Sequence, residues 1–257
     1  MTLVGRWLAH PLTRGLDPDD PATTAVRRRV IEGKPFLRKI YLEWYDRLRR
    51  ALPAVEGRIL ELGSGAGFFR ELCPEAITSE LFVCPGIESV IDARELPFPD
   101  RSLRAIVMTD VMHHIPEPAR FLGEAERALV PGGRLLMIEP WVSAWSKFVY
   151  TRFHPEPFRP EASNWDFPSS GPLSGANGAM PWMIFERDLA AFRKRFPGLD
   201  VARVELMMPF RYLLSGGVSM RSLAPAWSYT LCKGAERLLA PWMRHLAMFA
   251  FIAVERR

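Results

Sequence analysis

The feature that most constrains the fold is a short apolar segment that runs directly into a glycine-rich turn. Residues 58–68 read Arg-Ile-Leu-Glu-Leu-Gly-Ser-Gly-Ala-Gly-Phe. A short apolar run bounded by turn residues is typical of a buried strand. Glycines in the turn let the backbone approach a ligand closely, and a helix N-terminus presents free N–H groups to that ligand. The segment therefore predicts a strand, a ligand-binding loop and a helix, in this order.

The rest of the chain continues this alternation of strands and helices. Asp20 before Pro21 predicts the cap of a helix that runs to about residue 32, and Pro35 predicts the first turn of a second helix that runs to about residue 52. Further strands are predicted at 76–83, 104–109, 134–138, 201–207 and 247–254, and further helices at 68–73, 118–129 and 186–196. Such alternation is typical of a parallel sheet with right-handed crossovers.

Composition excludes several classes of protein. Apolar residues make up 48% and charged residues 25% of the chain, which is ordinary for a globular protein and excludes a disordered or collagen-like chain. Cys73, Cys84 and Cys232 lack the paired spacing of a zinc site, so we expect reduced structural thiols. The longest apolar run, Leu246–Val254, is far shorter than the ~20 residues of a spanning helix. With no secretory signal recognisable, we expect a cytoplasmic protein.

Charge is distributed unevenly along the chain. The net charge is +5, with basic residues in excess before residue 60 and after residue 140, and acidic residues in excess between them. One interpretation is an ordinary solvated surface. The other is a basic rim that faces an anionic substrate or the inner face of a membrane, with weak peripheral association.

The details of the glycine loop separate it from other nucleotide-binding loops. A dinucleotide fingerprint requires a small residue where Phe68 stands, and no phosphate-binding G-x-x-x-x-G-K-[ST] sequence is present. Glu61 stands two residues before the first glycine. A carboxylate at this place suits a cationic ligand better than a pyrophosphate.

Taken together, these motifs resemble those of a known family. Glu61-x-Gly63-x-Gly65-x-Gly67 is similar to motif I of the class I S-adenosylmethionine-dependent methyltransferases. Residues 92–98 (Asp-Ala-Arg-Glu-Leu-Pro-Phe) resemble the family's adenine-contacting stretch, 109–114 its segment after strand four, and 127–133 its turn before strand five. The resemblance implies an α/β fold: a Rossmann-like, doubly wound, seven-stranded, mainly parallel sheet with an antiparallel last strand, N-terminal helices and aromatic-rich cap insertions.

The resemblance also implies a set of cofactor-binding residues. They are Glu61, Gly63, Ser64, Gly65, Gly67, Glu80, Asp92, Ala93 and Thr109. In the family, the acidic residue at the place of Glu80 binds the ribose hydroxyls, and Asp92 contacts the adenine amine. The chain departs from the family in having Glu80 where aspartate is commoner, and Arg104 where an acidic residue often precedes strand four.

We expect residues 1–257 to form a single methyltransferase domain. Its predicted parts are an N-terminal helical extension over 1–56, a cofactor-binding core over 57–140, and cap insertions over 141–185 and 211–245. Both insertions are rich in aromatic residues or methionine and follow strands of the sheet. Ligands bind beyond the carboxyl ends of the strands in such folds, so we expect the insertions to line a substrate cavity.

The predicted catalytic residues are His114, His113 and Asp110, which follow the fourth strand. A histidine with an ordinary pKa can remove a proton from a hydroxyl acceptor at neutral pH, although paired histidines in this segment also serve as packing residues in the family. We expect no metal. The predicted substrate contacts are His154, Trp141, Arg152 and Arg211.

By this resemblance, the protein transfers a methyl group from S-adenosylmethionine, releasing S-adenosylhomocysteine, to a small or amphipathic acceptor. The expected reaction is O-methylation of a lipid-linked glycan, a phenol or an acid. One alternative is a catalytically silent cofactor-binding regulator. Another is a nucleic-acid or protein methyltransferase, but the chain has neither the N-P-P-Y-like tetrad of base-modifying relatives nor a separate basic domain. We therefore expect no nucleic-acid partner, and the sequence leaves the oligomeric state open.

Overall fold

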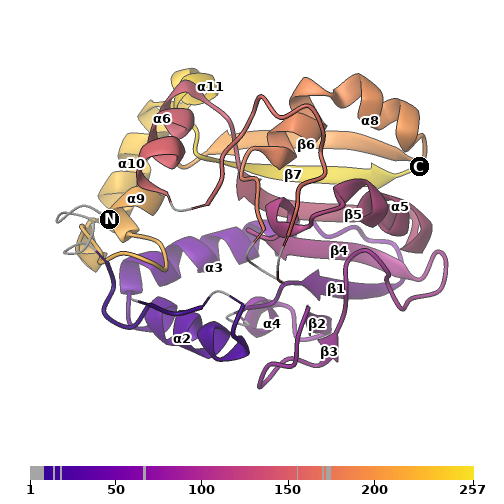
Figure 1. The fold of residues 1–257 in the computed structure, drawn as a ribbon, viewed down its shortest axis with the longest axis horizontal. Helices are drawn as coiled ribbons and strands as arrows, with labels where there is room; N and C mark the ends of the chain where they lie inside the picture. The colour runs from indigo at the N-terminus through magenta and orange to yellow at the C-terminus, as the bar shows by residue number, and fades with distance from the viewer. Residues whose placement is uncertain are drawn as a thin grey trace.

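The computed structural model describes residues 9–257 except 14, 18, 66, 67, 155, 170 and 172–174. Its centre is a seven-stranded sheet of order β3-β2-β1-β4-β5-β7-β6 (Figure 1). The strands are β1 (Arg58–Leu62), β2 (Ala76–Glu80), β3 (Ser89–Val90), β4 (Leu103–Thr109), β5 (Leu129–Pro140), β6 (Leu199–Met207) and β7 (Phe249–Arg256). Only β7 runs against its neighbours, β5 and β6. The predicted fold class is confirmed.

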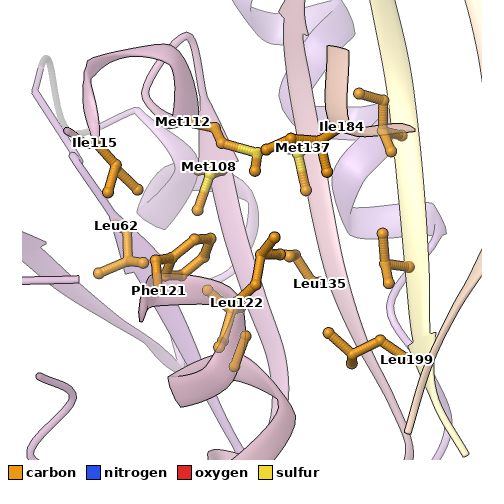
Figure 2. Close-up of a cluster of buried hydrophobic side chains, with 14 of the residues drawn as sticks. Leu62, Met108, Met112, Ile115, Phe121, Leu122, Leu135, Met137, Ile184 and Leu199 are labelled. Carbon is orange, nitrogen blue, oxygen red and sulfur yellow. The ribbon is translucent and has the colours of Figure 1, made fainter. Parts of the chain in front are cut away.

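Side chains of successive strand residues point to opposite faces, so each face of the sheet has its own core. Ile59, Ala105 and Val107 pack on one face with α3 (Pro35–Arg50) and α4 (Phe69–Leu72). On the other face, strand residues pack with α5 (Pro118–Ala128) and α8 (Leu189–Arg195). Figure 2 shows part of this second core, in which Phe121 and Leu122 of α5 lie against the strands. Both faces are covered, as expected for a parallel sheet.

The N-terminal helices begin where the sequence predicts. The Asp20 carboxylate accepts a hydrogen bond from the backbone N–H of Ala22 and caps α2 (Pro21–Glu32). Helix α3 follows from Pro35 and buries a stripe of apolar side chains that includes Leu37, Ile40 and Trp44. This burial fixes α3 across the sheet, and the guanidinium of Arg38 lies over the ring of Phe68, directly after the glycine loop.

Three predicted boundaries are wrong. The second strand, expected to run to residue 83, ends at Glu80. The fifth strand begins at Leu129, not at residue 134, because Leu129 already pairs with Leu103 and the ladder then shifts register. The glycines at 132 and 133 allow this irregularity, since Gly132 has a φ of +75°. The helix expected from residue 186 begins at Leu189, because a π-turn, η2 (Met183–Arg187), precedes it.

The two predicted insertions contain helices of their own. The first holds α6 (Ala144–Phe153) and α7 (Met180–Trp182), and the second holds α9 (Arg211–Ser215), η3 (Ala226–Ser228), α10 (Tyr229–Leu238), η4 (Ala240–Trp242) and α11 (Met243–Leu246). Figure 1 shows α6, α9, α10 and α11 gathered beyond one end of the sheet, the end to which β1 points. Among the described residues, no helix has both the length and the apolar character needed to cross a membrane.

Candidate active site

A cavity of about 870 Å³ opens where β1, β2 and β4 end, in the size range of small-molecule sites. Its walls come from these strand ends, from α2 and α3, from α6 and the segment after it, and from residues 212–220. Parallel strands of doubly wound sheets bind ligands at their carboxyl ends. The predicted insertions thus contribute walls to the same cavity as the glycine loop.

The glycine loop after β1 depends on left-handed backbone conformations. Gly63 and Gly65 have φ angles of +63° and +47°. A Cβ on Gly63 would lie 2.5 Å from Cγ2 of Val111, whereas a Cβ on Gly65 would meet only ordinary contacts. Ser64 is anchored to β2 because its Oγ accepts the N–H of Ser79. Gly63, Ser64 and Gly65 line the cavity, and the predicted Gly67 lies outside the described residues.

Glu80, at the end of β2, joins this strand to the glycine loop. Its Oε1 accepts the backbone N–H of Gly65 at 2.7 Å. The side chain lines the cavity, and burial raises the pKa of its carboxyl. Thr109, at the end of β4, also lines the cavity, and its buried Oγ1 has no hydrogen-bond partner among the residues that the structure describes. A buried hydroxyl without a partner is costly unless a ligand satisfies it.

The segment after β3 supplies the cavity with a charged edge. Asp92 and Ala93 both line the cavity. Arg94 donates to both carboxylate oxygens of Asp92, and these hydrogen bonds hold the pKa of Asp92 below its ordinary value. Arg94 also pairs with Glu117. The Asp92 carboxylate is therefore fixed and ionised beside the cavity.

Glu61 is the predicted cofactor residue whose placement differs most from the expectation. Its side chain is buried and is not among the residues that line the cavity. Its Oε2 has no hydrogen-bond partner, and burial raises the pKa of this carboxyl to about 8. A direct contact between Glu61 and a cationic ligand is not present in this geometry.

Asp110 and the two following histidines lie at the turn after β4. Asp110 lines the cavity in a left-handed conformation, with a φ of +62°, and burial raises its pKa to about 7. Strained residues of this kind cluster at functional sites. His114 lines the cavity, whereas His113 lies beneath it and is buried.

The two histidines differ in their partners and in their charge. His113 Nδ1 lies 2.7 Å from a carboxylate oxygen of buried Glu139, and its Nε2 lies 3.5 Å from Glu156. Burial would lower the pKa of His113, but these carboxylates outweigh it and hold the pKa well above its ordinary value. His114 donates from Nδ1 to the carbonyl of Gly175, and burial lowers its pKa to about 4. His114 is therefore neutral at pH 7.

Of the four predicted substrate residues, the structure brings His154 to the cavity. Trp141 is buried in the core that also holds Phe121 and Leu122 of α5. Arg152 is exposed and stacks on Phe148. Arg211 is buried away from the cavity lining, where it pairs with Glu43 and Glu236. The geometry does not support Trp141, Arg152 or Arg211 as substrate contacts.

Sequence reasoning did not single out Glu156 or Glu139. Glu139 lies at the end of β5, where its carboxylate also accepts the backbone N–H groups of Val111 and Met112. Its place at a strand end in a parallel sheet was a usable signal. Glu156 lies in a proline-rich segment with no periodic pattern, and nothing in the sequence indicated that it meets His113 and His114.

Comparison with known proteins points in one direction. Residues 73–137 match a family model described as a methyltransferase domain. An uncharacterized methyltransferase of Mycobacterium tuberculosis is 31% identical over 102 residues, which cover 34% of this chain and 41% of the relative. A phthiotriol/phenolphthiotriol dimycocerosates methyltransferase of Mycobacterium ulcerans is 32% identical over 114 residues, covering 37% of this chain and 42% of the relative.

The fold is shared with solved structures. Geranyl diphosphate C-methyltransferase from Streptomyces coelicolor superposes with a TM-score of 0.53 at 13% identity, covering 98% of this chain and 87% of the other. A Haloferax volcanii chain from a complex with the Trm112 methyltransferase activator gives 0.51 at 15% identity, covering 93% and 96%.

Residues 73–137 are thus similar to a methyltransferase domain, and the chain shares its fold with methyltransferases of known structure. The chain spans less than half the length of the curated relatives it matches.

The residues present fit the cofactor of class I methyltransferases. Gly65, the Thr109 hydroxyl and the carboxylates of Glu80 and Asp92 all face one cavity. Carboxylates and a hydroxyl are the groups that ribose hydroxyls and an adenine amine can bond. These four residues would hold the nucleoside part, and the cofactor would supply the electrophilic methyl group.

Proposed function

We propose that this protein transfers a methyl group from S-adenosylmethionine to a hydroxyl of a small acceptor with an extended apolar part, such as a lipid-linked glycan, a phenol or an acid. One observation carries the proposal. A single cavity joins the glycine loop to the group formed by His114, His154 and Glu156, and its wall from α6 is apolar (Val149, Tyr150 and Phe153).

Two relatives support this acceptor class by their names. One is the Mycobacterium ulcerans enzyme described above. The other is 27-O-demethylrifamycin SV methyltransferase of Amycolatopsis mediterranei, 41% identical over 46 residues, which cover 18% of this chain and 17% of the relative. Both names denote methyltransferases of small molecules. The apolar wall of the cavity is suited to acceptors of a comparable kind.

The residues of this chain have three tasks in the proposed reaction. The glycine loop, Glu80, Asp92 and Thr109 position the cofactor. The apolar wall positions the acceptor and excludes water, which is where much of the acceleration of a displacement reaction arises. His114 has a neutral imidazole. Its Nδ1 donates to the carbonyl of Gly175, so its Nε2 carries a lone pair that can accept the proton of the acceptor hydroxyl. His113, held as a cation, cannot accept that proton.

Binding of the cofactor is tested with two glycine variants. Gly65→Val places a β-branched side chain at a φ of +47° and in cavity space, so we expect loss of S-adenosylhomocysteine binding in calorimetry with the fold retained. Gly86→Val is the matched control, because Gly86 has a φ of +80° but lies outside the cavity lining. Asp92→Ala is expected to weaken binding by about 1–3 kcal/mol. Unchanged affinity in Gly65→Val would remove the glycine loop from the site.

Activity is tested by incubating the protein with methyl-labelled cofactor and lysate, then separating lipid, glycan, small-molecule and protein pools. We expect label in the lipid or small-molecule pool. His114→Ala should reduce turnover by ~10²–10⁴-fold with cofactor affinity nearly unchanged. His245→Ala, on the exposed helix α11, is the control. Cofactor binding without label in any pool would favour the silent regulator, and label in protein or nucleic acid would refute the acceptor class.

Peripheral association with an anionic membrane is the second part of the proposal. The apolar residues Trp227, Leu231 and Leu238 follow one another at helical spacing along η3 and α10, yet all three are exposed, at 74%, 67% and 77%. A helix normally buries such a stripe. Arg237 and Arg244 are exposed on the same segment. Apolar and basic side chains together suit the surface of an anionic bilayer.

Vesicle cosedimentation tests this association. We expect binding to vesicles containing anionic lipid at low salt, and its loss at high salt, because charges on the surface are screened. The double variant Leu231→Ser, Leu238→Ser should abolish binding. Val83→Ser is the control, since Val83 is equally exposed but lies after β2. No sedimentation of the wild type at low salt would refute the membrane proposal and leave the methyl-transfer proposal intact.

A further inference from the structure

His113, His114 and Glu156 bring two ring nitrogens and a carboxylate oxygen together beside the cavity. Nε2 of His113 lies 3.5 Å and Nε2 of His114 lies 3.9 Å from Oε2 of Glu156. One ligand atom from each of these three residues lies within 4.8 Å of the others. The tautomers of the two histidines decide what these three atoms can do for one another.

Both histidines use Nδ1 as the donor. Nδ1 of His113 lies 2.7 Å from Oε2 of Glu139, whose Oε1 accepts two backbone N–H groups. Nδ1 of His114 faces the carbonyl of Gly175, which can only accept. In the neutral imidazoles, each Nε2 therefore carries a lone pair. A metal cation that displaces the proton of His113 would therefore meet two lone pairs and a carboxylate oxygen.

These bonds are the ones that metal-ligating histidines make. A ligating histidine almost always donates its second N–H to a carboxylate or a backbone carbonyl, which fixes its tautomer and its ring orientation. Here Glu139 and Gly175 provide one partner of each kind. His113 and Glu139 are almost completely buried, with 1% and 0% of their surface exposed, so this support is rigid.

We propose that His113 and His114, through Nε2, and Glu156, through Oε2, bind one divalent transition-metal cation at the edge of the cavity. Two imidazoles and one carboxylate suit Zn²⁺, Co²⁺ or Fe²⁺ rather than Mg²⁺ or Ca²⁺, which prefer oxygen ligands. His154 is outside the ligand set, because its Nδ1 accepts the backbone N–H of Glu156 at 3.3 Å. Three protein ligands leave a position open toward the cavity, as in catalytic metal sites.

The cation would give this group a role in the proposed reaction, and that role, unlike the binding itself, rests on the proposed function. An acceptor hydroxyl in the open position would bind the cation through its oxygen and release its proton to solvent at a lower pKa. In that form the Nε2 lone pair of His114 is a ligand. The bound cation, in place of a free imidazole, then lowers the cost of deprotonating the acceptor.

Binding is tested with Co²⁺ on metal-free protein, by calorimetry and by visible absorption. We expect one Co²⁺ per chain, displaced by Zn²⁺, with no thiolate-to-cobalt charge-transfer band, because the three cysteines are not ligands. Glu156→Gln and His114→Ala should weaken binding by ~10–100-fold. His154→Gln is the matched control in the same cavity and should bind normally. Thermal unfolding of each variant shows that it is folded.

Three outcomes would overturn the inference: no stoichiometric Co²⁺ or Zn²⁺ binding by the wild type, equal binding by Glu156→Gln, or loss of binding in His154→Gln alone. In the first case His113 is protonated and forms ion pairs with Glu139 and Glu156. A separate experiment, turnover by metal-free protein, tests the proposed function independently of metal binding. Turnover by metal-free protein with a chelator present would leave methyl transfer standing and refute the role of the cation.

Discussion

The buried carboxyl of Glu61, whose Oε2 has no hydrogen-bond partner among the described residues, leads to a stability effect that can be measured without any ligand. Burial raises its pKa from an ordinary 4.5 to about 8, so the folded protein keeps Glu61 protonated at neutral pH. In the unfolded chain the same carboxyl ionises near pH 4.5. Between these two pH values the folded state binds one more proton than the unfolded state, and stability therefore falls as the pH rises.

The size of the effect follows from the pKa difference. Each pKa unit corresponds to 1.36 kcal/mol, so raising the pH from 5 to 7.5 should cost about 3 kcal/mol of unfolding free energy through this one group. The variant Glu61→Gln keeps the shape of the neutral acid and cannot ionise. We expect it to resemble the wild type at pH 5 and to be more stable by about 3–4 kcal/mol at pH 7.5.

Urea unfolding of both proteins at pH 5 and pH 7.5 measures this difference. Other titrating groups are common to the two proteins and cancel when one free energy is subtracted from the other, provided that they do not couple to Glu61. Glu80 is the neighbour that does couple, so Glu80→Gln is measured in both backgrounds. A Glu61→Gln variant that is no more stable at pH 7.5 than the wild type would refute the reasoning and indicate that Glu61 is ionised in the fold.

Three further predictions concern stability. Gly63→Ala should destabilise the fold by about 1–3 kcal/mol in urea unfolding, because its Cβ would meet Val111 at a positive φ; an unchanged midpoint would contradict the contact. Arg211→Met should cost about 3–5 kcal/mol, since it leaves buried Glu236 without its cation and leaves Glu43 paired with Lys233, and the double variant with Glu236→Gln should recover part of the loss. Hydrogen bonds from Arg211 and its neighbours outweigh burial and lower the pKa of Glu43 to about 2, so stability should fall between pH 4.5 and 2, with a smaller fall in Glu43→Gln.

Much of the sheet could be predicted because the local sequence patterns specify the same elements that tertiary packing then stabilises. The apolar run before Gly63, the cap at Asp20 and the proline before α3 each specify a structure that the sheet then buries. The start of β5 could not be predicted. Pro-Gly-Gly normally ends an element, and only pairing of Leu129 with Leu103 extends the strand through it. Register across a sheet is a tertiary property that no local pattern contains.

Some residues of the candidate site could likewise be predicted from the sequence, and others could not. Gly63, Gly65, Glu80 and Asp92 follow strand ends, and the topology of a parallel sheet alone brings strand ends together. Glu156 belongs to an irregular segment whose path depends on contacts with distant residues, so its meeting with His113 is visible only in three dimensions. The predicted roles of the site residues remain predictions for the experiments above.

The reversed strand β7 has a consequence for the order in which the protein can be made. Strand β7 lies between β5 and β6 in the sheet. Neither β5 nor β6 can pair with it until residues 249–256 have been synthesised. Until then, the nascent chain presents a free edge on β5, next to the apolar residues 135–138. An unpaired apolar edge is a template for association with other chains. A ribosome that pauses within the second insertion would therefore expose the nascent chain to aggregation at the stage when its methyltransferase core is otherwise complete.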